Sequence, residues 1–167
     1  AQAKLLRALQ DQGELVHDEM GMWTARPDIG WNILPTRVEA VIAQRIDHLP
    51  AELRQLLDTA SIEGESFMVE VVAQVHNVPV ITLLNDLSQE LDQRYRLVRE
   101  QGELHIGNQT LTRYQFRHQL FQQYLYQQLS HAQRRYLHGR VAEVLEKFAT
   151  TETNPLVVPL AYHFLAA

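Results

Sequence analysis

The 167-residue sequence contains no cysteine and no hydrophobic run long enough to cross a bilayer. The lack of cysteine excludes disulfide bonds and thiolate zinc sites, and it fits a cytoplasmic protein. Because a transmembrane helix needs roughly 20 apolar residues, we expect no contact with a membrane interior. The N-terminus has neither a signal-peptide pattern nor an initiator Met, which suggests a piece of a longer protein.

Sequence motifs of common catalytic sites are also lacking. The seven glycines are scattered, so there is no phosphate-binding loop of the GxxxxGK[ST] type, and no GxGxxG, HExxH or GxSxG occurs. The acidic pairs Asp18–Glu19 and Glu63–Glu65 fall at predicted turns or helix ends, where solvated or capping roles are usual. His131 and His138 lie seven residues apart without a third ligand, so we expect neither catalysis nor a bound metal or other cofactor in this chain.

Acidic residues are absent from positions 104–142, although the whole chain has 20 acidic and 15 basic residues. This stretch could bind an anion: a nucleotide phosphate, a nucleic acid or an acidic part of the same protein. The net charge of −5 argues against a general nucleic-acid binder. The basic side chains of the stretch are Arg113, Arg117, Arg134, Arg135, Arg140, His105, His118, His131 and His138.

The spacing of apolar residues predicts a mainly α-helical protein with a small β component. Three helices followed by a β-ribbon describe a winged helix, which is a helix-turn-helix variant with a small β wing, here flanked by additional helices. Turn signals stand at Gln101-Gly102 and Gly107-Asn108. Helices are predicted over 4–10, 36–49, 50–64, 79–94, 119–129 and 130–148, and two more are predicted to start at Ser66 and at Pro159. Strands are predicted over 96–99, 103–106 and 111–116. A small hairpin is predicted over 14–24, a loop over 25–33 and a linker over 150–154.

Arg117 and His118 form the candidate site, at the predicted junction of a strand and a helix. A helix N-terminus favours anions, arginine offers a planar fork that suits phosphate, and histidine can donate to a phosphate oxygen. In the alternative, Arg117 pairs with an acidic helix such as 86–92, and His118 caps a helix or fills an edge of the core. DNA binding is a third reading, but the predicted recognition helix, 80–94, has three acidic residues against one arginine.

Four segments together resemble a known family. The order and spacing of Leu34–Pro50, Leu57–Gly64, Tyr114–Leu120 and Leu137–Glu146 are similar to the region that follows the ATPase core in large bacterial signal-transduction ATPases. These are STAND-type relatives of the AAA+ ATPases, often fused to tetratricopeptide repeats, to a transcription-factor domain or to a nucleotide cyclase. The resemblance extends over most of residues 4–165.

The resemblance implies a division of labour. Residues 1–48 would end the ATPase module, 49–130 would form the winged helix, and 131–167 would lead into a tetratricopeptide-like repeat. The parent protein would bind ATP or ADP through an upstream P-loop module, and this non-catalytic segment would couple nucleotide state to a downstream sensor or effector. In related apoptosome-type proteins a winged-helix histidine touches the β-phosphate of ADP, and His118, beside Arg117, is most similar to it. The partners would be modules of the same chain, and a homo-oligomer is compatible with exposed apolar surface.

Overall fold

The computed structural model describes residues 15–17, 23–25, 36–148 and 157–167. The chain divides into two compact units, Ala1–His48 and Leu49–Ala167. The helix predicted over 4–10, the linker predicted over 150–154 and most of the loop predicted over 25–33 lie outside the described residues.

In the first unit, the described residues form a two-stranded hairpin and one helix. Strand β1 (Leu15–His17) pairs antiparallel with β2 (Trp23–Ala25), which confirms the predicted hairpin. Helix α2 (Thr36–Asp47) follows. Its apolar side chains at helical spacing, Val38, Ile42 and Ile46, are all buried, as the periodicity predicts.

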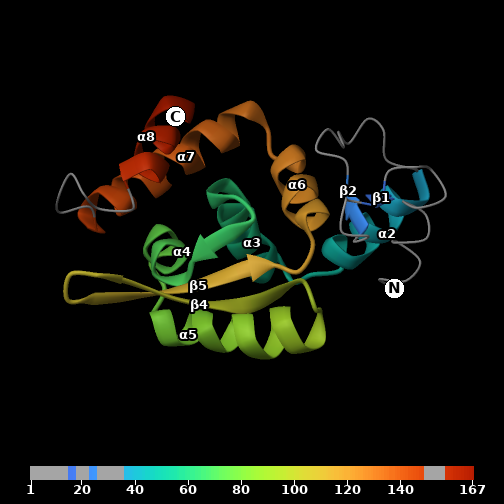
Figure 1. Ribbon diagram of the computed structural model, residues 1–167, viewed down its shortest axis with the longest axis horizontal. Helices are drawn as coiled ribbons and strands as arrows, with labels where there is room; N and C mark the ends of the chain where they lie inside the picture. The colour runs from blue at the N-terminus through green and yellow to red at the C-terminus, as the bar shows by residue number, and fades with distance from the viewer. Residues whose placement is uncertain (1–14, 18–22, 26–35, 149–156) are drawn as a thin grey trace. The chain divides into compact units, whose positions relative to one another are not determined.

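The described residues of the second unit are mainly helical, with one three-stranded antiparallel sheet whose strand order is β3-β5-β4. In Figure 1, α5 and its continuation η2 lie on one face of this sheet, and α3 and α4 lie on the other. Helices α7 and α8 pack side by side. The prediction of a mainly α-helical protein with a small β component is confirmed. The elements are α3 (Ala51–Glu63), β3 (Ser66–Met68), α4 (Val69–His76), α5 (Val80–Asn85), η2 (Asp86–Arg94, a π-helix), β4 (Val98–Ile106), β5 (Gln109–Phe116), α6 (Gln119–Gln128), α7 (His131–Phe148) and α8 (Val157–Ala166).

The prediction of a helix that starts at Ser66 is wrong. Ser66 begins strand β3, in which Phe67 lies opposite Tyr114 of β5, and helix α4 starts only at Val69. The ring of Phe67 packs against Phe116, with centroids 5.5 Å apart. Pairing with a distant strand therefore overrides the local preference for a helix at Ser66, because it buries the aromatic side chain of Phe67.

The predicted turn at Gln101-Gly102 is also wrong, whereas the turn at Gly107-Asn108 is confirmed. Strand β4 continues through Gly102, and its register with β5 shifts between Glu100 and Gly102. Gly102 has φ +147°, a conformation that favours glycine. A glycine in a strand pattern thus marks a β-bulge here instead of a chain reversal.

Helix α7 begins with a reciprocal cap between Ser130 and Gln133. The backbone N–H of Gln133 donates to Oγ of Ser130 at 3.2 Å, and the backbone N–H of Ser130 donates to Oε1 of Gln133 at 2.8 Å. Two N–H groups that the helix leaves without partners are satisfied in this way. The cap therefore fixes where α7 starts, directly after α6.

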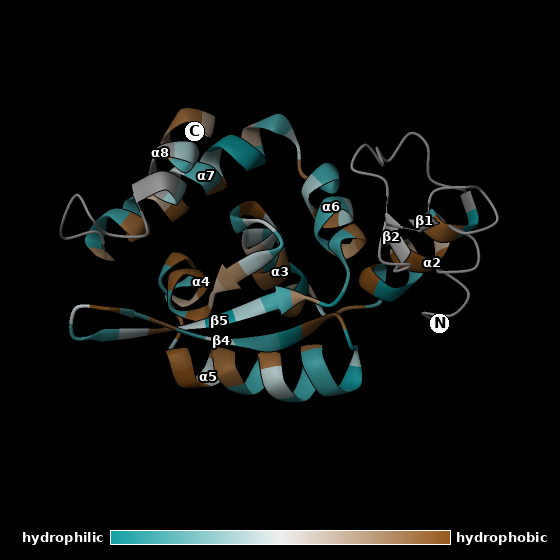
Figure 2. Ribbon diagram, viewed as in Figure 1, coloured by the Kyte–Doolittle hydropathy of each residue, from teal (hydrophilic) through white to brown (hydrophobic). Residues whose placement is uncertain are grey.

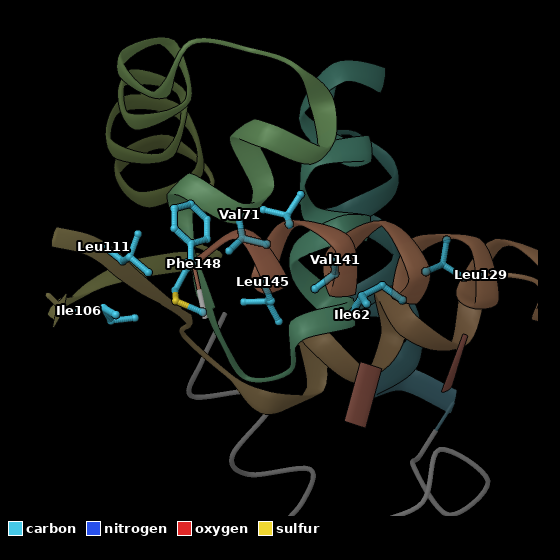
Figure 3. Packing of buried hydrophobic residues seen from close by; sticks show 10 residues of the cluster. Ile62, Val71, Ile106, Leu111, Leu129, Val141, Leu145 and Phe148 are labelled. Atoms are coloured by element: carbon cyan, nitrogen blue, oxygen red, sulfur yellow. The ribbon is translucent and has the colours of Figure 1, made fainter. Parts of the chain in front are cut away.

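Helix α7 lays its apolar face across α3 and α4 and completes the core. Leu145 and Val141 lie close to Val71 of α4 and Ile62 of α3, and Phe148 lies towards the hairpin formed by β4 and β5 (Figure 3). The whole cluster consists of Ile62, Met68, Val71, Ile106, Leu111, Leu129, Val141, Val144, Leu145 and Phe148. Because this cluster joins the β4–β5 hairpin, α3, α4 and α7, these elements form one packed body.

Truncation of Leu145 tests this packing. Its side chain is 0% exposed, so we expect Leu145→Ala to lower the free energy of unfolding by about 2–5 kcal/mol through lost burial and a residual cavity. Leu165→Ala is the matched control, because Leu165 is 89% exposed and should change stability by less than about 0.5 kcal/mol. Urea unfolding followed by circular dichroism measures both. Equal effects of the two substitutions would contradict this account of the core.

Candidate functional site

His118 occupies the junction between β5 and α6 as the N-cap of the helix. Its backbone is extended, and its Nδ1 accepts a hydrogen bond from the backbone N–H of Leu120 at 3.1 Å. The ring meets Phe121 edge-on, with centroids 6.4 Å apart. Burial lowers the pKa of His118, and the nearby Glu65 carboxylate opposes this effect only in part. The imidazole is therefore favoured in its neutral form at neutral pH.

The cap also selects the tautomer of His118. Because Nδ1 accepts a hydrogen bond, the proton of the neutral ring resides on Nε2. Within the described part of the chain, Nε2 has no hydrogen-bond partner. His118 thus combines a structural bond through one nitrogen with a donor on the other nitrogen, next to a helix N-terminus.

Arg117 is held by two groups of the same unit. Its Nη2 donates to Oδ1 of Asp92 in η2 at 2.5 Å, and its Nε donates to the backbone carbonyl of Val98 at 3.0 Å. Its backbone N–H donates to the carbonyl of Leu97 at 2.8 Å. The pairing of Arg117 with the acidic helix 86–92, given above as the alternative to phosphate binding, is therefore confirmed. This guanidinium ties η2 to the end of the sheet.

Two further arginines of the acid-free stretch have internal partners. Arg134 donates from Nε to the carbonyl of Tyr126 at 2.9 Å and from Nη2 to that of Gln127 at 3.2 Å. Its guanidinium also lies over the Tyr126 ring, 4.5 Å from the centroid. Arg140 pairs with Glu143 at 2.8 Å. Arg134 thus satisfies carbonyls at the end of α6, where a cation is favoured.

Helix α5 and its continuation η2 present acidic side chains. Asp86, Glu90 and Asp92 stand against one arginine, Arg94, which pairs with Glu90 at 3.2 Å and lies over the Tyr95 ring. The first turn of α5 is hydrophobic and the η2 end is largely hydrophilic (Figure 2). The helix that would read DNA in a helix-turn-helix protein therefore offers little positive charge.

The two acidic pairs do not make an acid–base site in the described residues. Both carboxylate oxygens of Glu63 accept from the backbone N–H of Met68 at 3.3 Å. Burial, with a smaller contribution from the Glu70 carboxylate, raises the pKa of Glu63 well above its ordinary value. Glu65 is exposed, so the two side chains have different environments. Asp18 and Glu19 lie outside the described residues.

Two groupings were not anticipated from the sequence. The first is a cleft of about 230 Å³ between α3, α4 and α7. In this cleft, Oγ1 of the buried Thr59 is hydrogen-bonded to Nε2 of His76 at 2.7 Å. Burial lowers the pKa of His76.

The second grouping is a contact between His138 of α7 and His163 of α8, whose Nδ1 atoms are 2.8 Å apart. His131, in contrast, is exposed, so the two α7 histidines have separate environments. Neither grouping has a sequence signature, because its members come from elements far apart in the chain.

Other proteins give no guide to this site. Comparison with protein-family models, with curated proteins and with solved structures finds no match. Across 36–148 and the other described residues, no three His, Cys, Asp or Glu side chains come together as a metal site would require. None of the helices in the described part of the chain has the length and apolar character of a bilayer crossing.

A double-mutant cycle on Arg117 and Asp92 tests the structural role of this pair. Both side chains are about one-quarter exposed, so we expect a coupling free energy of about 1–2 kcal/mol from Arg117→Met and Asp92→Asn. The matched control is the cycle on Arg94 and Glu90, an exposed pair expected to couple by about 0.3–0.5 kcal/mol. Chemical unfolding of the variants supplies the values. A coupling near zero for Arg117 and Asp92 would remove this ion pair from the account of the junction.

Proposed function

We propose that residues 49–130 form a winged helix and that the chain is a non-catalytic regulatory segment of an ATP-driven signal-transduction ATPase. The order helix, strand, helix, helix, strand, strand, with sheet order β3-β5-β4, supports the winged helix. The upstream P-loop module would hold ATP or ADP, and this segment would respond to which of them is bound. The resemblance of Leu34–Pro50 and Tyr114–Leu120 to such proteins supports the same proposal.

The observation that carries the proposal is the arrangement of His118. Its Nδ1 is used in the cap of α6, and its Nε2 carries a proton without a partner in the described residues. A phosphate oxygen from another module would find this donor beside the N-terminus of a ten-residue helix, where negative charge is favoured. Arg117, held by Asp92 and Val98, would keep this junction in place, and His118 would make the contact.

The packing of α7 supports a route for coupling. Because α7 packs on α3 and α4 and carries α8, a movement of the winged helix would also move the end of the chain. In the proposed mechanism, ADP favours the arrangement in which His118 meets its β-phosphate, and ATP favours another. Such a segment acts by shifting the populations of two states.

DNA binding by the winged helix is the alternative function. The acidic side chains of α5 and η2 disfavour it, because a helix in the major groove runs between phosphates. A cytoplasmic location and modules of the same chain as partners fit the first proposal better.

Substitution of His118 separates its two roles in the parent protein that includes the ATPase module. Serine is a good N-cap, so His118→Ser should unfold within about 0.5 kcal/mol of the wild type, whereas His118→Ala should lose about 1 kcal/mol. Both should release ADP roughly 10- to 100-fold faster, because a hydrogen bond to a charged group is lost. Release of a fluorescent ADP analogue measures the rate. An unchanged rate in His118→Ser would exclude the phosphate contact.

A gel-shift assay with the 167-residue chain tests the DNA alternative. We expect no retardation of mixed-sequence duplex DNA at low salt, where phosphate contacts are strongest. A variant with Asp86→Lys and Glu90→Lys serves as the control for the charge argument, because it should gain weak binding that is lost as salt rises. Salt-dependent binding by the wild type would favour the DNA-binding function.

A further inference from the structure

A chain of three polar side chains, two of them buried and one half-buried, connects α6, α7 and α8. The Tyr126 hydroxyl lies 3.2 Å from Nε2 of His138, and Nδ1 of His138 lies 2.8 Å from Nδ1 of His163. His138 is 1% exposed and His163 is 2% exposed. The contact between the two rings is therefore shielded from water, and it joins α7 to α8 through side chains 25 residues apart in the sequence.

The bond between the two Nδ1 atoms limits how many protons the pair can hold. One Nδ1 must carry a proton and the other must be bare, which two neutral imidazoles achieve. A first added proton can occupy an Nε2 without breaking the bond, but it places a positive charge in a buried site. A second added proton puts two N–H groups and two positive charges face to face. Protonation therefore opposes the contact at both steps.

No Asp or Glu side chain is among the causes that shift the pKa of either histidine. Helices α6 and α8 contain no acidic residue, and the positive charge of Arg134 also disfavours protonation of His138. The aromatic groups that meet the His138 ring are Tyr126 and Tyr162.

Three acidic groups of the helices that pack on α7 have partners elsewhere. Asp58 accepts from Arg54, Glu63 from the backbone N–H of Met68, and Glu70 from the backbone N–H of Thr112. On α7 itself, Glu143 pairs with Arg140. The two histidines thus face an environment that strongly favours their neutral forms.

The docking of α8 depends on this contact. Among the side chains of α8 that the structure describes, only His163 is buried, whereas Phe164 and Leu165 are exposed. The end of the helix closes over Gly139, where an added Cβ would lie 3.7 Å from Cβ of Ala167. His163 is therefore the main described anchor of α8 on α7.

We propose that the His138–His163 contact is a pH-sensitive latch, which holds α8 on α7 at neutral pH and releases it when the pair takes up protons in mildly acidic conditions. The latch goes beyond the nucleotide switch proposed above and does not depend on it. Release would uncover the face of α7 around His138 and free the end of the chain.

Burial lowers the pKa of both histidines, and that of His163 falls from 6.5 to about 4, also because His138 lies beside it. A lowered pKa in the docked state means that the released state binds protons more readily. Docking is therefore fully favoured above pH 6.5 and weakens as the pH falls towards 4. From His163 alone, the ratio of docked to released α8 should fall about 20-fold between about pH 7 and pH 5.

Hydrogen–deuterium exchange of the 167-residue chain, followed by mass spectrometry, measures this ratio. After correction for intrinsic rates, protection of the α8 amides should fall about 20-fold from about pH 7 to pH 5, because a short free helix is unstable. Protection of α7 around Leu145 should stay constant. The control His131→Gln removes an exposed histidine from the same helix and should behave like the wild type.

The variant His163→Asn keeps a short hydrogen-bonding group near His138 but cannot take up a proton, so most of the pH dependence should disappear. If this variant leaves α8 unprotected at neutral pH, the result identifies His163 as the anchor of α8. NMR titration of the wild-type imidazoles then tests whether protonation releases α8. In molecules whose α8 is docked, His163 should remain neutral at about pH 5. Protection that does not change with pH, the same loss in His163→Asn, or ordinary titration of His163 with α8 still docked would each overturn the latch.

Discussion

The hydrogen bonding of strand β5 to two neighbours is the constraint on which the second unit depends. Its central place between β3 and β4 brings together chain segments on either side of three helical elements. The strand ends where the backbone N–H of Phe116 donates to the carbonyl of Glu65 at 3.0 Å. The next two residues, Arg117 and His118, are therefore delivered to fixed positions, one against η2 and the other at the start of α6. Both parts of the candidate site follow from the end of one strand.

How far the sequence predicts this arrangement depends on the range of the interactions involved. Helices with a regular apolar stripe, such as α3 and α7, are predictable because the 3.6-residue period of burial is a local property. The cap between Ser130 and Gln133 is local as well. Strand β3 has only three residues, and the partner of Phe67 lies 47 residues away at Tyr114, so its signal is weaker than that of the helix beside it. The pairing of Arg117 with an acidic helix was foreseen as one of two roles, whereas the His138–His163 contact has no local pattern at all.

The segregation of charge along the chain acquires a structural meaning. A stretch without carboxylates looks at first like an anion-binding surface, but Arg117, Arg134 and Arg140 have partners inside the unit. The lack of acidic residues matters more for two histidines of this stretch, His118 and His138. No acidic residue of positions 104–142 is available to stabilise an imidazolium at His138 or to accept the Nε2 proton of His118. One compositional bias thus underlies two different proposals.

The bulge at Gly102 also constrains the length of the hairpin. Val98 lies opposite Phe116, and Leu104 lies opposite Leu111. On β5 these two partners are five residues apart and so face opposite sides of the sheet, whereas Val98 and Leu104 are six apart and would face the same side in a regular strand. The extra residue at the bulge inverts the alternation, so that Leu104 and Ile106 turn towards Leu111 and the end of α7. Gain or loss of one residue between Glu100 and Leu104 would therefore move the side chains of the distal half of β4 to the opposite face of the sheet. Single-residue insertions and deletions at this point of the hairpin are therefore incompatible with the core.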